Sequence, residues 1–242
     1  MAIVTTYRSS VYSTTAATSY TCAPTYTPAA SSLLVACVVT TLGATPLDPT
    51  TVTGHGVSFT MLSLSARLLS TTHAVSVWIA NAGGSPTSVA CVASYGAVSQ
   101  TGGAIIEFEV TGADLTGTLA ASIVQNPTNT GTATSGSVTL AAPGKPENRP
   151  LSFWLHLANE ATTAQSLWTL TAGATGNFNT PATGAAGQYR ADSFETPATA
   201  SWTTSALWRG VALEIKAAAV TPTAQPLRIQ HLNRAVTRSN TY

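Results

Sequence analysis

The sequence predicts an all-β sandwich, and three observations support this fold class. Short apolar or β-branched runs recur through residues 33–216, separated by turn-forming Gly, Pro, Asn or Ser. Several runs alternate apolar and polar residues with the period of two that a half-buried strand requires. No segment shows the helical period, and only 8% of the residues are charged, which excludes long charged helices. We therefore expect an antiparallel sandwich of about a dozen strands in two sheets.

The expected strands follow one another closely along the chain. They span residues 33–40, 56–62, 74–80, 88–94, 104–110, 119–125, 137–141, 151–157, 166–171, 188–192, 200–204 and 207–216. The low-complexity stretch 172–187 is expected to be a surface loop. The predicted core consists of the apolar members of these runs: Leu34, Val35, Phe59, Val77, Ile79, Ile106, Phe108, Phe153, Leu155, Leu170, Leu213 and Ile215.

Residues 1–32 are expected to form an extended arm that lies against another chain and not in the core of its own. The segment is polar and contains few aliphatic residues, but tyrosines recur at Tyr7, Tyr12, Tyr20 and Tyr26. Each tyrosine combines apolar area with a polar tip, which suits a contact surface. Residues 33–216 would then be the folded domain.

Residues 217–242 predict a second, basic arm. Residues 1–216 hold seven basic and nine acidic residues, a net charge of −2, whereas the arm holds three arginines and no acid. Arginine pairs well with carboxylates, so an acidic partner surface is expected. The contact residues would be Leu227, Arg228, Ile229, Leu232, Arg234 and Arg238.

The residues that usually perform chemistry are few and scattered. The four histidines show no metal-binding spacing, and no nucleophile elbow, phosphate-binding loop or dinucleotide motif occurs. Glu107 and Glu109 share one strand face, where paired carboxylates could serve a glycosidase but more often form a solvated edge. We therefore expect neither enzymatic activity, a metal nor a cofactor.

The three cysteines, Cys22, Cys37 and Cys91, do not form a disulfide framework, because their number is odd and no CxxC pair occurs. Cys37 and Cys91 are expected to be buried apolar residues, and they could pair only if their strands face each other. Trp78, Trp168 and Trp208 lie in apolar runs and are expected in the core.

Trp154 and Trp202 lie among polar neighbours, so they are the candidates for stacking on a sugar. The formal net charge of +1 disfavours non-specific binding to nucleic acid. No apolar run reaches the length of a membrane span, and residues 1–32 do not resemble a secretory signal. Synthesis in the cytoplasm without a signal peptide is therefore expected.

A series of short motifs resembles the structural proteins of tailed bacteriophages. These motifs are YTPAASSLLV at 26–35, VTGHGVSF at 52–59, SVWIA at 76–80, GSPT at 84–87, VTGAD at 110–114, QYRA at 188–191, ASWT at 200–203 and WRGVALEIK at 208–216. Each motif is weak alone, but their order and spacing are more specific. Phe59 stands where tryptophan is common in that group.

The resemblance implies a jelly-roll or concanavalin-like sandwich in a virion, without catalytic residues. Proteins of this group decorate capsids or form head fibres and tail parts. The expected function is that of a capsid decoration protein on the virion surface, with the major capsid protein and copies of itself as partners. The alternatives are a tail or fibre module that binds a host-surface glycan and, less favoured, a glycan hydrolase.

Overall fold

A computed structural model describes residues 2–42, 46–171 and 183–219 of the chain, and this part is all-β. Its strands are β1 (Val4–Ser13), β2 (Ser19–Thr21), β3 (Leu33–Thr41), β4 (Thr51–Gly54), β5 (Val57–Ser58), β6 (Thr60–Leu62), β7 (His73–Asn81), β8 (Val92–Ser94), β9 (Gly102–Thr111), β10 (Ile123–Gln125), β11 (Thr128–Val138), β12 (Arg149–His156), β13 (Thr163–Ala164), β14 (Thr169–Leu170), β15 (Gly184–Tyr189) and β16 (Ala198–Ile215). One turn of 3-10 helix, Leu119–Ser122, precedes β10. No helix in the described part of the chain has the length and apolarity needed to cross a membrane.

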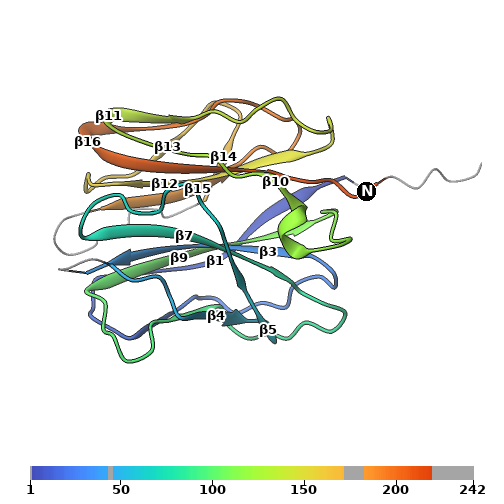
Figure 1. Cartoon of the computed structure of the whole chain (residues 1–242), viewed down its shortest axis with the longest axis horizontal. Coiled ribbons are helices and arrows are strands. Elements are labelled where there is room, and N and C mark those ends of the chain that lie inside the picture. Colours follow the sequence, from blue (N-terminus) through green and yellow to red (C-terminus); the bar gives the residue numbers. More distant parts are fainter. Residues whose placement is uncertain (1, 43–45, 172–182, 220–242) are drawn as a thin grey trace, which may run out of the picture.

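The strands form three antiparallel sheets that lie in layers (Figure 1). The central sheet has the order β1-β9-β3-β7-β6. A seven-stranded sheet on one side has the order β10-β16-β12-β15-β14, with β11 and β13 also paired to β16. A four-stranded sheet on the other side has the order β2-β8-β4-β5. The prediction of an all-β sandwich is confirmed, but the prediction of two sheets is wrong, and the jelly-roll connectivity stays a prediction.

The central sheet is buried on both faces. Successive residues of β3 point to opposite sides, so Val35 and Cys37 enter the core against the seven-stranded sheet, whereas Ala36 and Val38 enter the core against the four-stranded sheet. A strand buried on both faces is typically apolar at nearly every position and not only at alternate ones. The continuous apolar run of β3 is the sequence counterpart of this third layer.

A third apolar cluster covers the outer face of the seven-stranded sheet. Trp154 of β12 and Trp208 of β16 lie with ring centroids 5.9 Å apart, and Trp202 packs on Trp208 at 6.3 Å. The register between β11 and β16 shifts between Ala133 and Ser135, so that β16 holds extra residues around Trp202. This irregular pairing in the first half of β16 brings Trp202 over the sheet face that carries Trp154.

The prediction of an N-terminal arm is wrong. Residues Val4–Ser13 form β1, which pairs with β9 along its length and is an edge strand of the central sheet. The following segment pairs with β8 through β2, and Ser10 and Ala23 exchange backbone hydrogen bonds of 3.3 and 3.1 Å. The segment is polar because an edge strand buries fewer of its side chains than a central strand does, and this composition resembles that of an unfolded arm.

The expected loop at 172–187 is wrong for residues 184–187, which belong to the buried strand β15, and residues 172–182 lie outside the described part. The reason is packing: a Cβ atom on Gly187 would lie 2.6 Å from the ring of Phe108. Small residues in β15 leave space for the aromatic rings of neighbouring strands, so the stretch lacks the bulky residues by which strands are recognised. The two runs expected at 200–204 and 207–216 are one strand, β16.

The predicted core is confirmed except at Leu170, which is half-buried. Phe108 is fully buried, and its ring makes edge contacts with Tyr7, Phe153 and Tyr189 at centroid distances of 6.1, 5.7 and 6.0 Å. The tryptophans expected in the core, Trp78, Trp168 and Trp208, are also buried.

Candidate functional site

A buried ion pair joins the central sheet to the four-stranded sheet. The Nε2 atom of His55 lies 2.9 Å from Oε1 of Glu107, and both side chains are fully buried. Glu107 comes from β9, on the face opposite Phe108, where the sequence predicts a solvated edge. That prediction is wrong for Glu107 and Glu109, because the four-stranded sheet and the chain before β3 cover this face.

A two-residue turn places His55. The residue lies between the paired strands β4 and β5, and His55 and Gly56 both have positive φ values, 56° and 84°. These values are typical of the type I′ turn of a β-hairpin, and glycine is the residue that adopts them without strain. Gly54 allows the hairpin to approach β8, because a Cβ atom there would lie 2.8 Å from the Cα of Cys91. The sequence Thr53-Gly54-His55-Gly56 therefore directs the imidazole of His55 into the interior.

Each carboxylate has several hydrogen-bond donors. The hydroxyl of Ser9 donates to Oε2 of Glu107 at 2.7 Å, while His55 occupies the other oxygen. Glu109 accepts from Nε of Arg8 at 2.7 Å and from the backbone N–H of Ala29 at 2.6 Å. A buried carboxylate needs such partners, because an unpaired one costs several kcal/mol.

Tyr26 closes the site from the N-terminal segment. Its ring lies 4.4 Å from the ring of His55, and its backbone carbonyl lies 3.2 Å from Nδ1 of His55. The guanidinium of Arg8 lies over the ring of Tyr26, with its Cζ atom 5.3 Å from the ring centroid. Both nitrogens of His55 are thus engaged, which fixes the orientation of the imidazole.

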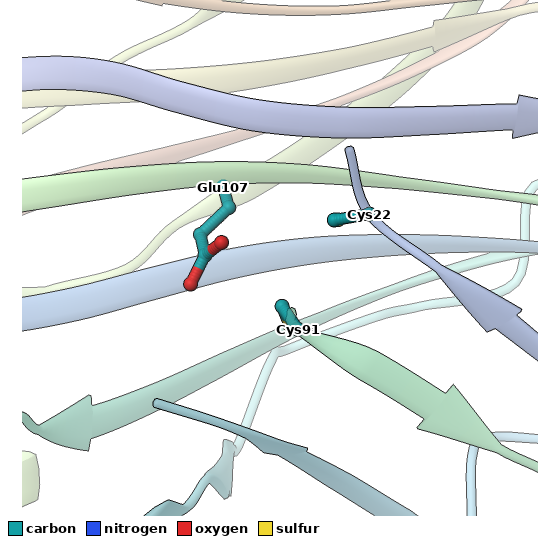
Figure 2. Close-up of side chains that lie close together, drawn as sticks. All are labelled: Cys22, Cys91 and Glu107. Carbon is teal, nitrogen blue, oxygen red and sulfur yellow. The ribbon is translucent and has the colours of Figure 1, made fainter. Parts of the chain in front are cut away.

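Two thiols complete the cluster. Cys22 and Cys91 are buried, and their sulfur atoms and a carboxylate oxygen of Glu107 all lie within 4.8 Å of one another (Figure 2). Both cysteines are free in this structure. Cys37 is on the opposite side of the central sheet, in the core against the seven-stranded sheet, so the pairing of Cys37 with Cys91 that the sequence left open does not occur.

The charges of the cluster perturb its titration. Burial by itself lowers the pKa of His55, but the hydrogen bond and the negative charge of Glu107 outweigh it, so the pKa lies above 6.5. The hydrogen bond with the Cys22 thiol, burial and the charge of Glu107 raise the pKa of Cys91 well above 9.0. A thiol with a raised pKa stays protonated near neutral pH and is a poor nucleophile.

The ligand atoms of Cys22, Cys91 and Glu107 only partly meet the requirements of a soft metal cation. Zinc prefers four ligands in a tetrahedron, with sulfur and nitrogen favoured. Cys22, Cys91 and Glu107 supply three, the described residues add no fourth to this group, and both oxygens of Glu107 already accept hydrogen bonds. The cluster is closed to solvent, and its arrangement is that of an interior network that ties two sheets together.

The four tyrosines of the expected N-terminal contact surface lie against this chain itself. Tyr20 is buried, with its ring over Gly103 of β9, where a Cβ atom would lie 2.5 Å from the ring. Tyr7 and Tyr12 are half-buried and pack against the core between the central and seven-stranded sheets. The ring of Tyr26 packs against that of His55 at a tilt of 53°. The expectation that they contact another chain and not their own is therefore wrong.

The expectation that Trp154 and Trp202 stack on a sugar is also wrong, because both side chains are buried. Trp154 and Trp202 are 2% and 5% exposed, so neither presents a ring face to solvent. Trp202 stacks on His156 at a centroid distance of 4.5 Å, and the indole of Trp154 donates to Ser152 at 3.1 Å. The polar neighbours of Trp154, Ser152 and His156, are themselves buried, whereas those of Trp202 are exposed although its indole is not. The six residues expected to make the C-terminal contact, Leu227, Arg228, Ile229, Leu232, Arg234 and Arg238, lie outside the described residues.

A surface depression on the seven-stranded sheet is lined mostly by hydroxyl groups. It has a volume of about 310 Å³ and lies where β11, β13 and the first half of β16 meet. Hydroxyl groups dominate its lining, which consists of Ser135, Gly136, Ser137, Thr163, Ala164, Gln165, Thr199, Ala200 and Ser201. The depression is uncharged, so its chemistry would suit a neutral polar ligand.

No protein-family model, curated protein or solved structure matches the chain.

Sequence reasoning missed the buried cluster because its members lie far apart in the chain. His55 and Glu107 are 52 positions apart, and Cys22, which follows β2, is far in the sequence from Cys91, which precedes β8. One local feature could have indicated part of it, since histidine between two glycines in a hairpin turn points to a specific side-chain placement.

Proposed function

We propose that this chain is a non-enzymatic structural protein of a tailed-bacteriophage virion that decorates the outer surface of the capsid. Its partners would be the major capsid protein and copies of itself, and its location the virion surface. The order and spacing of the motifs at 26–35, 52–59 and 208–216 support this assignment, together with the all-β sandwich fold.

The observation that carries the proposal is the location of the carboxylates. Glu107, Glu109 and Glu214 are at most 1% exposed, and each accepts hydrogen bonds from within the chain. Glu214 accepts from the backbone N–H of Gly144 at 2.8 Å. These acids serve the interior, whereas an acid–base catalyst must reach its substrate.

The outer surface supports the same proposal. The strand β11, with the sequence TNTGTATSGSV, is exposed or half-buried at nine of its eleven positions and carries no charge. A neutral hydroxyl-rich surface on a rigid three-layered body suits a protein that acts by contact in many copies. The basic residues Arg228, Arg234 and Arg238 would add an attachment to an acidic shell, with each exposed pair contributing about 0–1 kcal/mol.

The test is the copy number of the chain in purified virions of the phage that encodes it. A decoration protein is present in hundreds of copies, in fixed ratio to the major capsid protein, and can be rebound to capsids that lack it. A few copies per particle would assign the chain to the tail, and its absence from virions would refute the proposal. A chain ending at Lys216, compared with the full chain at low and high salt, would measure the contribution of the C-terminal segment.

The hydroxyl-lined depression favours one second candidate, a tail or fibre module that binds a host-surface glycan. Sugar hydroxyls can exchange hydrogen bonds with the side chains of Ser137, Thr163 and Ser201 at its rim. The measurement is binding of the full chain to a glycan array. A specific signal that the filling variant Ser201→Trp abolishes would support the glycan module, whereas the absence of binding by either form would reject it.

A further inference from the structure

Cys22 and Cys91 lie directly opposite each other in an antiparallel ladder. The pairs Ser19 with Ser94, Tyr20 with Ala93 and Thr21 with Val92 set the register of β2 and β8. One position further, the backbone N–H of Cys22 donates to the carbonyl of Cys91 at 2.9 Å. Opposed residues of a hydrogen-bonded antiparallel pair have Cα atoms about 5.5 Å apart, which is the separation most often found across a disulfide.

We propose that Cys22 and Cys91 form a cross-strand disulfide when the protein is in an oxidising medium. The bond would tie β2, and with it the segment that carries β1, to the four-stranded sheet. It would close a loop of about 70 residues, which restricts the unfolded chain far more than the folded one.

The negative charge of Glu107 beside the two sulfurs favours an uncharged disulfide over a pair of thiolates. The carboxylate of Glu107 lies in the same group of atoms as the two sulfurs, and its charge opposes the formation of a thiolate on Cys91. A metal ion would require both thiolates to persist beside this carboxylate, and among the described residues the group offers only three ligand atoms. A disulfide removes both ionisable protons and leaves the pair between His55 and Glu107 intact.

The reaction balances with glutathione disulfide as the oxidant. The thiolate of one cysteine attacks a sulfur of glutathione disulfide, forming a mixed disulfide and releasing one glutathione thiolate. The second cysteine, as thiolate, then attacks the protein sulfur of the mixed disulfide and releases the other glutathione. Two protein thiols lose two electrons and two protons, and the oxidant is reduced to two molecules of glutathione.

Access to the thiols requires local opening. Cys22 is 3% and Cys91 0% exposed, so the oxidant cannot reach either in the closed structure. β2 has only three residues and lies at the edge of its sheet, so few hydrogen bonds oppose its local detachment. Oxidation of the folded protein is therefore expected to be slow, and oxidation during refolding fast.

The experiment uses the full chain, unfolded in urea with glutathione and glutathione disulfide and then refolded. Free thiols are alkylated, and the chain is cut after aromatic residues, at Tyr20 and Tyr26 and at Trp78 and Tyr95, which separates Cys22 from the other cysteines. Mass spectrometry of the peptides is expected to show one link, between Cys22 and Cys91, with a mass loss of about 2 Da for two hydrogens.

Variants and stability measurements complete the test. The matched control Cys37→Ala, which removes a buried thiol from the other core, is expected to form the same link, whereas Cys22→Ala and Cys91→Ala are expected to lose it. The oxidised wild type is expected to melt about 10 °C above its reduced form.

Three outcomes would overturn the proposal. They are three alkylated thiols after oxidative refolding, a link that involves Cys37, or equal melting temperatures of a fully linked and a fully reduced sample. A fourth measurement addresses the rival occupant, because one equivalent of Zn²⁺ bound by the reduced wild type, protecting both thiols and lost in Cys22→Ala, would assign the pair to a metal.

Discussion

Replacing Glu107 by glutamine is expected to destabilise the protein by about 3 kcal/mol near pH 6, since removing one partner of a buried ion pair costs 3–5 kcal/mol. Glu107 and His55 are both fully buried, so solvent does not compensate for the lost charge. The lower end of the range applies because glutamine keeps the shape of the side chain and can still accept the hydrogen bond from Ser9. With a urea dependence of about 3 kcal/mol per M for a chain of this size, the unfolding midpoint is expected to fall by roughly 1 M.

The same substitution is expected to change the dependence of stability on pH. The folded-state pKa of His55 lies above 6.5, so its pairing with Glu107 stabilises the fold fully below the unfolded pKa. This contribution is lost as the pH rises through the folded pKa. The difference in unfolding free energy between wild type and Glu107→Gln should therefore be largest in mildly acidic buffer and shrink toward alkaline pH.

Glu109→Gln provides the matched control, because Glu109 lies on the same strand face and pairs with Arg8 and not with a histidine. Urea unfolding of the three proteins at pH 5.5, 7 and 8.5, followed by tryptophan fluorescence, gives the comparison. An unchanged midpoint for Glu107→Gln, or a loss as independent of pH as that of Glu109→Gln, would refute the reasoning.

Four further substitutions and truncations test other parts of the fold. Burial lowers the pKa of His156 to about 4, so the unfolded chain takes up a proton between pH 6.5 and 4 that the folded chain does not; the melting temperature of wild type should fall across this interval more steeply than that of His156→Gln. Phe108→Ala should cost about 3–5 kcal/mol in urea unfolding, and a variant as stable as wild type would show that the ring is not in the core. Gly210→Ala should cost about 1–3 kcal/mol by the same measurement, because the added Cβ would lie 2.5 Å from the ring of Trp154, and a gain in stability would contradict this packing. Deleting residues 2–13 removes an edge strand of the central sheet and should abolish cooperative unfolding in circular dichroism, whereas a folded product would restore the view of this segment as an arm.

The apolar faces of the strands were predictable because they depend on local spacing. In β9, Ile106, Phe108 and Val110 occupy alternate positions, and the structure buries all three against the seven-stranded sheet. The period of two is a property of any extended chain, so it can be read without knowing which strand lies alongside. The same argument located β12 and the second half of β16, whereas β3 and β7 were recognisable as nearly continuous apolar runs.

The candidate site was not predictable in this way, because burial of a polar residue depends on what covers it. Glu107 and Glu109 have the spacing of a solvated strand face, and only the four-stranded sheet and the segment around Tyr26 make that face internal. Trp202 has polar neighbours in sequence, yet the irregular pairing of β16 brings it onto His156.

The sequence by itself determined the all-β class, the neutral surface and most of the core, since composition and alternation act over a few neighbouring residues. The tertiary structure decided that the sandwich has a third layer, that the N-terminal residues are a strand, and that Cys22, Cys91, His55 and Glu107 meet. These outcomes depend on pairings between residues tens of positions apart. A polar edge strand and a free polar arm have the same composition, and only the hydrogen bonds between β1 and β9 distinguish them.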